Sequence, residues 1–256
     1  MNLKLETRNS KLAVIILAAG KGTRMRSSLA KVLHPLHKAP MLSYSVAVAR
    51  EVGAADIVVV VGHQADLIEE TMKDEGLVFV LQKEQLGTGH AVLQTRDHFR
   101  NFQGTILILC GDVPLLRGAT VRDLMERHRT GQAAVTVMTT LLADPSGYGR
   151  IVKGDGDRIL KIVEERDATE EEKKIREINT GIYCAESPFL FEAAAAIDNR
   201  NAQKEYYLTD IVGIVNRMNR TVMSFVAPDF WEVMGINTRE DLERAENIIK
   251  RRGTRS

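Results

Sequence analysis

The sequence is poor in cysteine and nearly balanced in charge, and both features narrow the class of protein. Its 256 residues include two cysteines, Cys110 and Cys184, each ending an apolar, strand-like run. Such cysteines indicate buried, reduced thiols rather than a disulfide or a metal pair. The formal net charge is +1, so no nucleic acid or membrane partner is expected. Any site for an anion must therefore be local.

Long apolar runs are also missing. The longest, Leu12–Ala19, is far shorter than the roughly 20 residues that a helix needs to cross a bilayer. The segment before it, Met1–Lys11, is polar and mixed in charge and has no signal-peptide pattern. Together with the reduced cysteines, this predicts a cytoplasmic protein.

Repeats, linkers and histidine-based sites are absent as well. No internal repeat and no linker rich in Pro, Gly or Ser divides the chain, so we expect one domain over residues 1–256. The six histidines show neither metal-ligand spacing nor a partner for a nucleophile, and no Ser-His-Asp set is visible. A histidine-activated nucleophile is therefore not indicated.

Strand-like and helix-like segments alternate over the first half of the chain. Short apolar, β-branched segments predict strands covered on both faces at Leu12–Ala18, Asp56–Val61, Val78–Gln82 and Thr105–Cys110. Amphipathic segments between them predict helices at Met41–Val52, Gln64–Glu75 and Gly89–Asp97. This alternation predicts the α/β class, with a doubly wound, mostly parallel sheet.

The pattern loosens after about residue 133, where we expect a small mixed β sub-region. Predicted strands are Ala133–Leu141, Arg150–Val152, Arg158–Val163 and Glu177–Cys184, with a turn at 153–157. The charged run Glu165–Lys174 indicates a solvated loop or a short surface helix. Predicted helices follow at Pro188–Ile197, Leu208–Met218 and Thr238–Arg251.

A glycine loop, LAAGKGTRM, follows the first predicted strand. In a doubly wound sheet, ligands bind beyond the carboxyl ends of the strands. Gly20 and Gly22 allow close backbone approach, and Lys21, Arg24 and Lys31 add positive charge, which suits a triphosphate. The loop matches neither a Walker A motif nor the three-glycine dinucleotide fingerprint. The alternative is a tight surface turn with ordinary basic residues.

Seven motifs occur in order: LAAGKGTRM, KVLH, QLGTGHA, GDVPL, PSGYGRI, INTGIY and EYYLTD. Together they resemble the uridylyltransferase domain of the bacterial N-acetylglucosamine-1-phosphate uridylyltransferases, from about Leu12 to the final helix. In that family the domain usually precedes a left-handed β-helix acetyltransferase. The resemblance implies a Rossmann-like, GT-A-like fold. It also implies uridylyl transfer from UTP to N-acetylglucosamine 1-phosphate, giving pyrophosphate and UDP-N-acetylglucosamine, a precursor for the cell wall, peptidoglycan and lipopolysaccharide.

The resemblance also implies roles for individual residues. Arg24 and Lys31 would be the catalytic cations. Nucleotide-binding positions would be Leu17, Ala18, Ala19, Gly20, Gly22, Gln82, Gln85, Gly87, Thr88 and Gly111. Positions around the sugar phosphate would be Gly149, Glu164, Asn179, Tyr207 and Thr209. Three alternatives stay open: Thr88 as a helix cap, Glu164 as a solvated carboxylate beside Glu165, and Tyr207 as a partly buried aromatic.

The resemblance further implies a magnesium site. Asp112 and Asn237 would converge on one Mg²⁺ together with the nucleotide phosphates, since Mg²⁺ takes one or two protein oxygens besides waters and phosphates. Asn237 could instead cap the final helix. Residues 12–112 would then form the nucleotide half, 113–237 the sugar-phosphate half, and 238–256 a C-terminal helix.

The sequence departs from the family pattern at two positions. Ala30 replaces a usual proline, which should loosen the loop of Lys31, and Cys110 replaces a frequent tyrosine, so we expect weaker substrate affinity at most. No hexapeptide repeats appear before Ser256, so we expect no acetyltransferase activity and a monomer or weak self-association. Alternative functions are another sugar-1-phosphate nucleotidylyltransferase, a guanylyl- or cytidylyltransferase, and a catalytically silent sugar-nucleotide-binding homologue.

Overall fold

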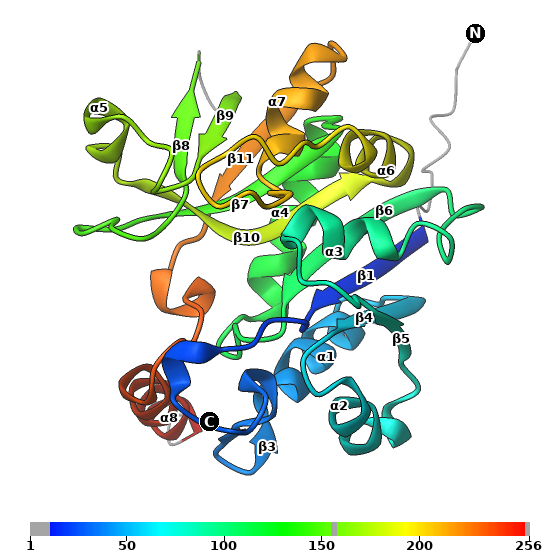
Figure 1. The fold of residues 1–256 in the computed structure, drawn as a ribbon, viewed down its shortest axis with the longest axis vertical. Helices are drawn as coiled ribbons and strands as arrows, with labels where there is room; N and C mark the ends of the chain where they lie inside the picture. Colours follow the sequence, from blue (N-terminus) through cyan, green and yellow to red (C-terminus); the bar gives the residue numbers. More distant parts are fainter. Residues whose placement is uncertain (1–10, 155–157, 254–256) are drawn as a thin grey trace, which may run out of the picture.

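The predicted strands join one mixed, nine-stranded sheet. The computed structural model describes residues 11–154 and 158–253. Seven strands run in the order β11-β7-β10-β6-β1-β4-β5, and β8 and β9 extend from β10 (Figure 1). Their bounds are β1 Lys11–Leu17, β4 Asp56–Val61, β5 Val78–Leu81, β6 Gly104–Cys110, β7 Val135–Leu141, β8 Arg150–Lys153, β9 Ile159–Val163, β10 Glu177–Glu186 and β11 Val222–Val226.

Parallel pairing dominates the first half and antiparallel pairing the second. The pairs β1–β4, β1–β6, β4–β5 and β7–β11 are parallel. Strand β10 is antiparallel to both β6 and β7, and β8 is antiparallel to β10 and β9. The prediction of a mostly parallel sheet with a small mixed β region is thereby confirmed. The turn predicted at 153–157 lies partly outside the described residues.

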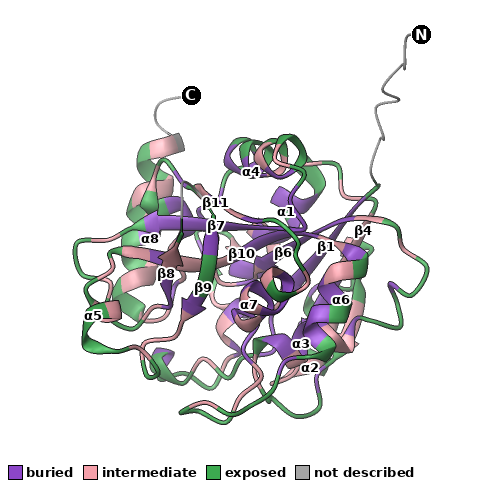
Figure 2. Cartoon of the chain, turned by 90° about the horizontal axis from the view of Figure 1, so that it is seen from above, coloured by how far each residue is buried: buried purple, intermediate pink, exposed green. Residues whose placement is uncertain are grey.

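Helices cover both faces of this sheet. Figure 2 shows the buried strands β1, β6, β7 and β10 with α1 and α4 on one side and α3, α6 and α7 on the other. The bounds are α1 Met41–Glu51, α2 Ala65–Thr71, α3 Thr88–Gln94, α4 Gly118–Thr130, α5 Glu170–Lys173, α6 Ser187–Ala195, α7 Asp210–Arg217 and α8 Arg239–Gly253. No helix in the described part of the chain has the length and apolarity to cross a membrane.

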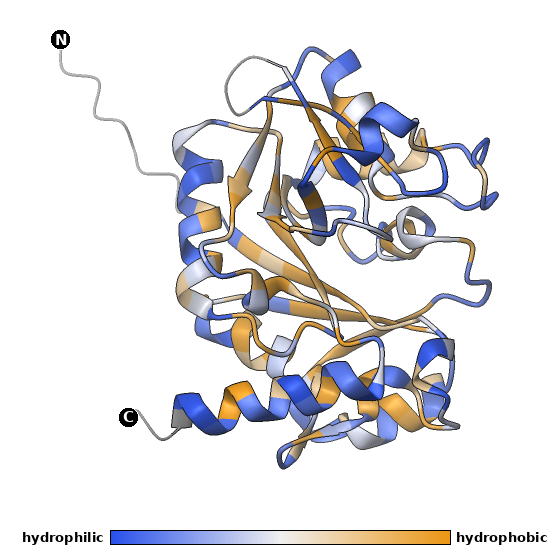
Figure 3. Cartoon of the chain, turned by 90° about the vertical axis from the view of Figure 1, so that its left-hand side faces the viewer, coloured by the Kyte–Doolittle hydropathy of each residue, from blue (hydrophilic) through white to orange (hydrophobic). Residues whose placement is uncertain are grey.

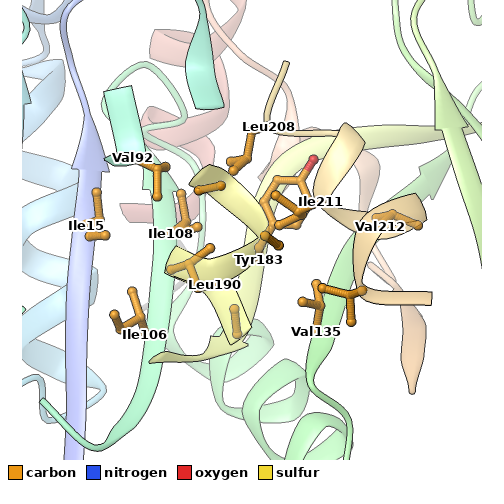
Figure 4. Close-up of a cluster of buried hydrophobic side chains, with 14 of the residues drawn as sticks. Ile15, Val92, Ile106, Ile108, Val135, Tyr183, Leu190, Leu208, Ile211 and Val212 are labelled. Atoms are coloured by element: carbon orange, nitrogen blue, oxygen red, sulfur yellow. The ribbon is translucent and has the colours of Figure 1, made fainter. Parts of the chain in front are cut away.

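Side-chain alternation along each strand divides the core between the two faces. Ile15, Ile106 and Ile108 face α3, α6 and α7 and pack with Val92 and Leu190 (Figure 4). Their strand neighbours, including Ile16 and Leu107, belong to the second cluster, which contains residues of α1, α2 and α4. The strands are therefore apolar throughout because both of their faces are covered.

Helix α8 packs away from the main sheet. Leu242, Ala245 and Ile249 join a small third cluster with Leu36 of β2 (Pro35–Leu36), the partner of β3 (Ala39–Pro40). Figure 3 shows α8 as a mainly hydrophilic helix with separate apolar bands. This amphipathic pattern anchors the chain beside the loop that follows β1.

Helix α4, strand β11 and the short strands β2 and β3 were not predicted. Helix α4 follows the GDVPL motif and ends in a turn that contains three basic residues. Strand β11 has only five residues; it forms a ladder with β7, and its Met223 forms an isolated bridge with Arg158. The charged run 165–174 contains a short helix, α5, capped reciprocally by Thr169 and Glu172. A short surface helix, one of the two predicted forms, is therefore confirmed.

Candidate active site

The carboxyl ends of β1 and β6 meet at the point where the strand order reverses. Leu17 pairs in register with Val60 on one side and Cys110 on the other. A cavity of about 330 Å³ opens beyond these ends. Most of the predicted nucleotide-binding residues line it: Leu17, Ala18, Ala19, Gly20, Gln82, Gln85, Gly87 and Thr88, together with Lys31 and Asp112. This is the position expected of a ligand crevice in such a sheet.

Two cations and two oxygen ligands gather at one end of this cavity. The ammonium of Lys31 forms an ion pair with Asp112 and donates to Asn237 Oδ1 at 3.1 Å. Arg24 donates from Nη2 to the same Asn237 oxygen at 2.8 Å. Asn237 Nδ2 donates to Gly235 O at 3.1 Å, and this obligate acceptor fixes the amide so that Oδ1 faces the cations. The structure thus brings all four predicted residues together.

Side-chain packing explains why the second residue of the loop's glycine pair, Gly22, must be a glycine. Gly22 adopts φ +60°, and a Cβ there would lie 2.5 Å from Lys31 Cβ. Any side chain would therefore displace the lysine, besides straining the backbone. Gly20 has open space around its Cα, which leaves the loop accessible to a ligand. Gly111 is not among the residues that line the cavity, and its N–H donates to Leu17 O at 2.9 Å.

The loop before Lys31, which was expected to be looser because of Ala30, is tethered at that residue. The N–H of Ala30, which a proline would lack, donates to Gln64 Oε1 at 2.5 Å. Gln64 Nε2 donates in turn to Ser28 O at 2.8 Å. Gln64 itself has φ +56°, an unusual conformation for a residue with a side chain. A clamp from the start of α2 therefore takes the place of the proline.

The base-side residues lie at the other end of the cavity. Gln82 is buried, and Gly87 has φ +114° and approaches the backbone of Tyr206 so closely that a Cβ would lie 2.6 Å from Tyr206 O. Helix α3 begins at Thr88, whose hydroxyl accepts from Leu208 N at 3.0 Å and does not cap the helix. The cap alternative for Thr88 is therefore wrong.

The predicted sugar-phosphate residues form a second group. Glu164, Tyr207 and Thr209 line a cavity of about 410 Å³ between β9 and α7. Thr209 Oγ1 donates to Glu164 Oε1 at 3.0 Å. A Cβ on Gly149 would lie 3.3 Å from Glu164 Oε2, and Asn179 N donates to Gly149 O at 2.9 Å. All five predicted residues are therefore neighbours.

Glu164 and Glu165 differ in their surroundings. Glu165 pairs with the buried Arg150 at 2.7 Å and accepts from Gly147 N at 3.1 Å, and these contacts lower its pKa. Burial raises the pKa of Glu164, and only its bond to Thr209 opposes that rise. Glu164 is therefore a cavity carboxylate and not a solvated one, whereas Glu165 holds the loop around Gly147.

The amide of Asn237 is not a helix cap. Thr238 accepts from Asp241 N at 3.1 Å, and Asp241 Oδ2 accepts from the N–H groups of Asn237 and Thr238 at 3.0 Å each. These reciprocal bonds cap α8 without the Asn237 side chain. The cap alternative for Asn237 is therefore wrong, and its Oδ1 is available to the cation site.

The donor set is compatible with a magnesium ion. Within residues 11–154 and 158–253, no group of three or more His, Cys, Asp or Glu side chains could hold a metal by itself. Asp112 and Asn237, however, already direct one oxygen each at a single positive group, the ammonium of Lys31. One carboxylate and one amide oxygen fit an ion that completes its shell with waters and phosphates.

Neither cysteine is prepared for nucleophilic chemistry. Cys110 borders the 330 Å³ cavity and donates weakly from Sγ to Gly181 O at 3.5 Å. Burial raises the pKa of this thiol to about 12, so the unreactive protonated form prevails at neutral pH. Cys184 is fully buried.

Sequence reasoning missed three residues that hold the site: Gln64, His90 and Arg150. His90 contacts Gln82, and Arg150 pairs with Glu165. An arginine within an apolar strand segment was an available signal, since a buried guanidinium needs a partner. Gln64 gave no signal, because its partners lie 34 and 36 residues away.

The sequence also matches a family model, described as Nucleotidyl transferase, over residues 13–250. The chain belongs to the nucleotidyl transferase family. Among curated relatives, the Bifunctional protein GlmU of Geotalea daltonii is 51% identical over 94% of this chain and 53% of its own length. The Bifunctional protein GlmU of Desulfotalea psychrophila is 43% identical over 95% of this chain and 72% of its own length. The resemblance to the bacterial bifunctional enzymes and the enzyme class, a nucleotidyltransferase, are thereby confirmed.

Two facts set the scope of these similarities. The chain spans about half the length of the first of these GlmU relatives. A crystal structure of UDP-glucose pyrophosphorylase complexed with UDP-glucose superposes with a TM-score of 0.75, at 19% identity over 95% of this chain and 99% of that one. At that identity the likeness concerns the fold, and it confirms the Rossmann-like nucleotidyltransferase architecture.

Proposed function

We propose that this chain transfers the uridylyl group of UTP to N-acetylglucosamine 1-phosphate. A sugar 1-phosphate has a second pKa of about 6, so it is mostly dianionic at neutral pH and needs no general base. One of its oxygens forms a bond to the α-phosphorus of UTP, and the bond from that phosphorus to the bridging oxygen breaks. The products are UDP-N-acetylglucosamine and pyrophosphate.

The observation that carries this proposal is the convergence of Lys31, Arg24, Asp112 and Asn237 at the end of the nucleotide cavity. Two anions must approach each other, so catalysis depends on positioning and on charge stabilisation. Lys31 and Arg24 supply fixed positive charge beside the triphosphate. Asp112 and Asn237 would hold Mg²⁺, which, when bound, neutralises phosphate charge and aligns the phosphate oxygens.

The remaining roles follow from the two cavities. Gln82, Gln85, Gly87 and Thr88 would bind the uracil, and Leu17–Gly20 with Gly22 and Gly111 would enclose the ribose and phosphates. Glu164, a carboxylate, would accept hydrogen bonds from sugar hydroxyls. Tyr207 and Thr209, which line the same cavity, and the neighbouring Gly149 and Asn179 would orient the sugar. Residues 12–112 would thus serve the nucleotide and residues 113–237 the sugar phosphate, within one domain.

Pyrophosphate release tests this proposal directly. We expect turnover with UTP, N-acetylglucosamine 1-phosphate and Mg²⁺, and little with glucose 1-phosphate or other nucleoside triphosphates. Efficient use of glucose 1-phosphate would instead identify a different sugar-1-phosphate nucleotidylyltransferase, and binding without turnover would identify a silent homologue. The monomeric or weakly associated state stays a prediction, which light scattering of this chain checks.

A further inference from the structure

Gln82 has a second partner besides the base loop, the imidazole of His90 on α3. Gln82 Nε2 lies 3.0 Å from Gly87 O and 3.0 Å from His90 Nδ1. A backbone carbonyl oxygen can only accept a hydrogen bond, so the group that faces Gly87 O must be the amide nitrogen. Its two hydrogens therefore serve Gly87 O and His90 Nδ1.

This arrangement determines which atom Gln82 offers to a ligand. The Gln82 side chain borders the nucleotide cavity, and its Oε1 accepts no hydrogen bond from the residues that the structure describes. An exposed acceptor at this point suits a base edge that carries a donor. Uracil presents N3–H there, whereas cytosine presents a lone pair at N3 that would repel the carbonyl oxygen.

The imidazole must hold its lone pair on Nδ1 for this purpose. Its Nε2 lies 3.0 Å from Gln94 Nε2, which also lies 3.3 Å from His90 O. Both ring nitrogens thus face amide nitrogens, although a neutral ring can accept at only one. The contact of Gln94 with His90 O is the longer one, at 3.3 Å, and Gln94 is half-buried, so its amide can turn. Gln82 is buried and held by Gly87 O at 3.0 Å. The lone pair therefore belongs on Nδ1, with the hydrogen on Nε2 directed to the Gln94 carbonyl.

We propose that His90 is a positioning residue that selects uracil over cytosine by fixing the amide orientation of Gln82. The inference rests on the proposed function, because it requires a pyrimidine nucleotide in this cavity. His90 acts through Gln82 alone: with Nδ1 as acceptor, the Gln82 carbonyl faces the base. Without that acceptor, the buried amide loses one of two partners and can turn its nitrogen toward the base.

The test compares UTP and CTP in three variants, by calorimetric affinity and by kcat/KM with N-acetylglucosamine 1-phosphate. His90→Phe keeps a planar ring but has no acceptor, and we expect the UTP:CTP preference to fall roughly three- to tenfold, the effect of one net hydrogen bond. His90→Asn places Oδ1 near the site of Nδ1 and should restore the preference. Gln94→Ala, on the other side of the ring, should leave it unchanged.

Each outcome separates the possibilities. A His90→Phe variant that binds both nucleotides equally less well, at an unaltered ratio, would reduce His90 to a packing residue and overturn the proposal. His90→Leu provides a second acceptor-free variant if circular dichroism shows that the Phe variant does not fold. A wild-type protein that binds neither nucleotide would overturn the proposed function itself, whatever the variants do.

Discussion

The two cavities of this protein handle charge in opposite ways. In the nucleotide cavity the ammonium of Lys31 is already paired with Asp112, and Arg24 bonds to Asn237. In the sugar cavity Glu164 accepts from the hydroxyl of Thr209, and the carboxylates of Asp167 and Asp210 also line the cavity. Lys161 and Arg200 line it too, but they pair with Glu172 and Asp198 rather than with Glu164. On the proposed function, the first would serve phosphates and metal, and the second the hydroxyl groups of the sugar.

The difference has a consequence for stability. Removing Asp112 takes the carboxylate from the Lys31 ammonium and leaves it the neutral amide oxygen of Asn237, which costs stability as well as catalysis. Burial disfavours the ionised form of Glu164, which raises the pKa of this carboxyl, so the ionised group destabilises the folded state. The comparison therefore predicts that substitutions in the first cavity mainly destroy activity, whereas neutralising Glu164 stabilises the fold while reducing activity.

The largest effect should come from Asp112→Ala. This substitution removes both the partner of Lys31 and one proposed metal ligand, so we expect kcat/KM to fall on the order of 10³-fold or more. Pyrophosphate release at saturating Mg²⁺ measures it, and circular dichroism should show an intact fold. The exposed Asp144→Ala is the matched control and should retain activity. Activity within tenfold of wild type in Asp112→Ala would remove the metal role from this residue.

Lys31→Ala should have the next largest effect. On the proposed function the ammonium would lie where negative charge builds in the transition state, and losing one such preorganised contact typically costs roughly 10²–10³-fold in kcat. We expect the KM for UTP to change much less. Lys21→Ala, an exposed lysine of the same loop, is the control and should change kcat little. A large rise in KM at constant kcat would assign Lys31 to ground-state binding.

Some of the residues in these predictions could be identified from the sequence, and others only from the structure. The fold class and the cation group were predictable, because apolar strands, glycine spacing and local motifs are written in short stretches of sequence. Helix α4 and strand β11 were missed, since their assignment depends on packing against distant elements. The clamp by Gln64 and the contact of His90 with Gln82 were missed for the same reason, because hydrogen-bond partners are a property of the folded chain.

Glu164→Gln should lower activity roughly tenfold and raise stability in a pH-dependent way. The folded-state pKa lies above the usual value of 4.5, so the native state binds more protons than the unfolded state between those two values. The favourable contribution of the protonated carboxyl is complete below about 4.5 and is lost as pH rises through the raised pKa. Glu164→Gln should therefore unfold at higher denaturant concentration than wild type at pH 7 to 8, with the gap closing at lower pH.

The neighbouring carboxylate supplies the control with the opposite sign. Glu165→Gln breaks the pair with Arg150, a guanidinium that is only 1% exposed, and leaves a buried charge unpaired. We expect this variant to be less stable than wild type near neutral pH. If Glu164→Gln and Glu165→Gln changed the stability equally, the two carboxylates would not differ in the cost of their ionised forms, and the comparison would fail.

The smallest effect concerns the clamp on the loop before Lys31. Gln64→Ala removes the bonds to Ala30 N and Ser28 O, and we expect kcat/KM to fall roughly three- to tenfold, because each net hydrogen bond contributes about 0.5–1.5 kcal/mol. Because Gln64 has φ +56°, Gln64→Gly serves as a control that removes the clamp without adding backbone strain. Both variants should lose activity to a similar extent.

Ala30→Pro tests whether that clamp replaces a proline. Ala30 has φ −51°, which a proline can adopt, so the ring would restrict the loop before it binds substrate. In the wild-type background the ring also removes the N–H that donates to Gln64, and its Cδ would crowd an oxygen now 2.5 Å from that nitrogen. We therefore expect little gain from Ala30→Pro alone but a recovery of activity in the Gln64→Ala background. Strict additivity in this double-mutant cycle would show that the two devices act independently.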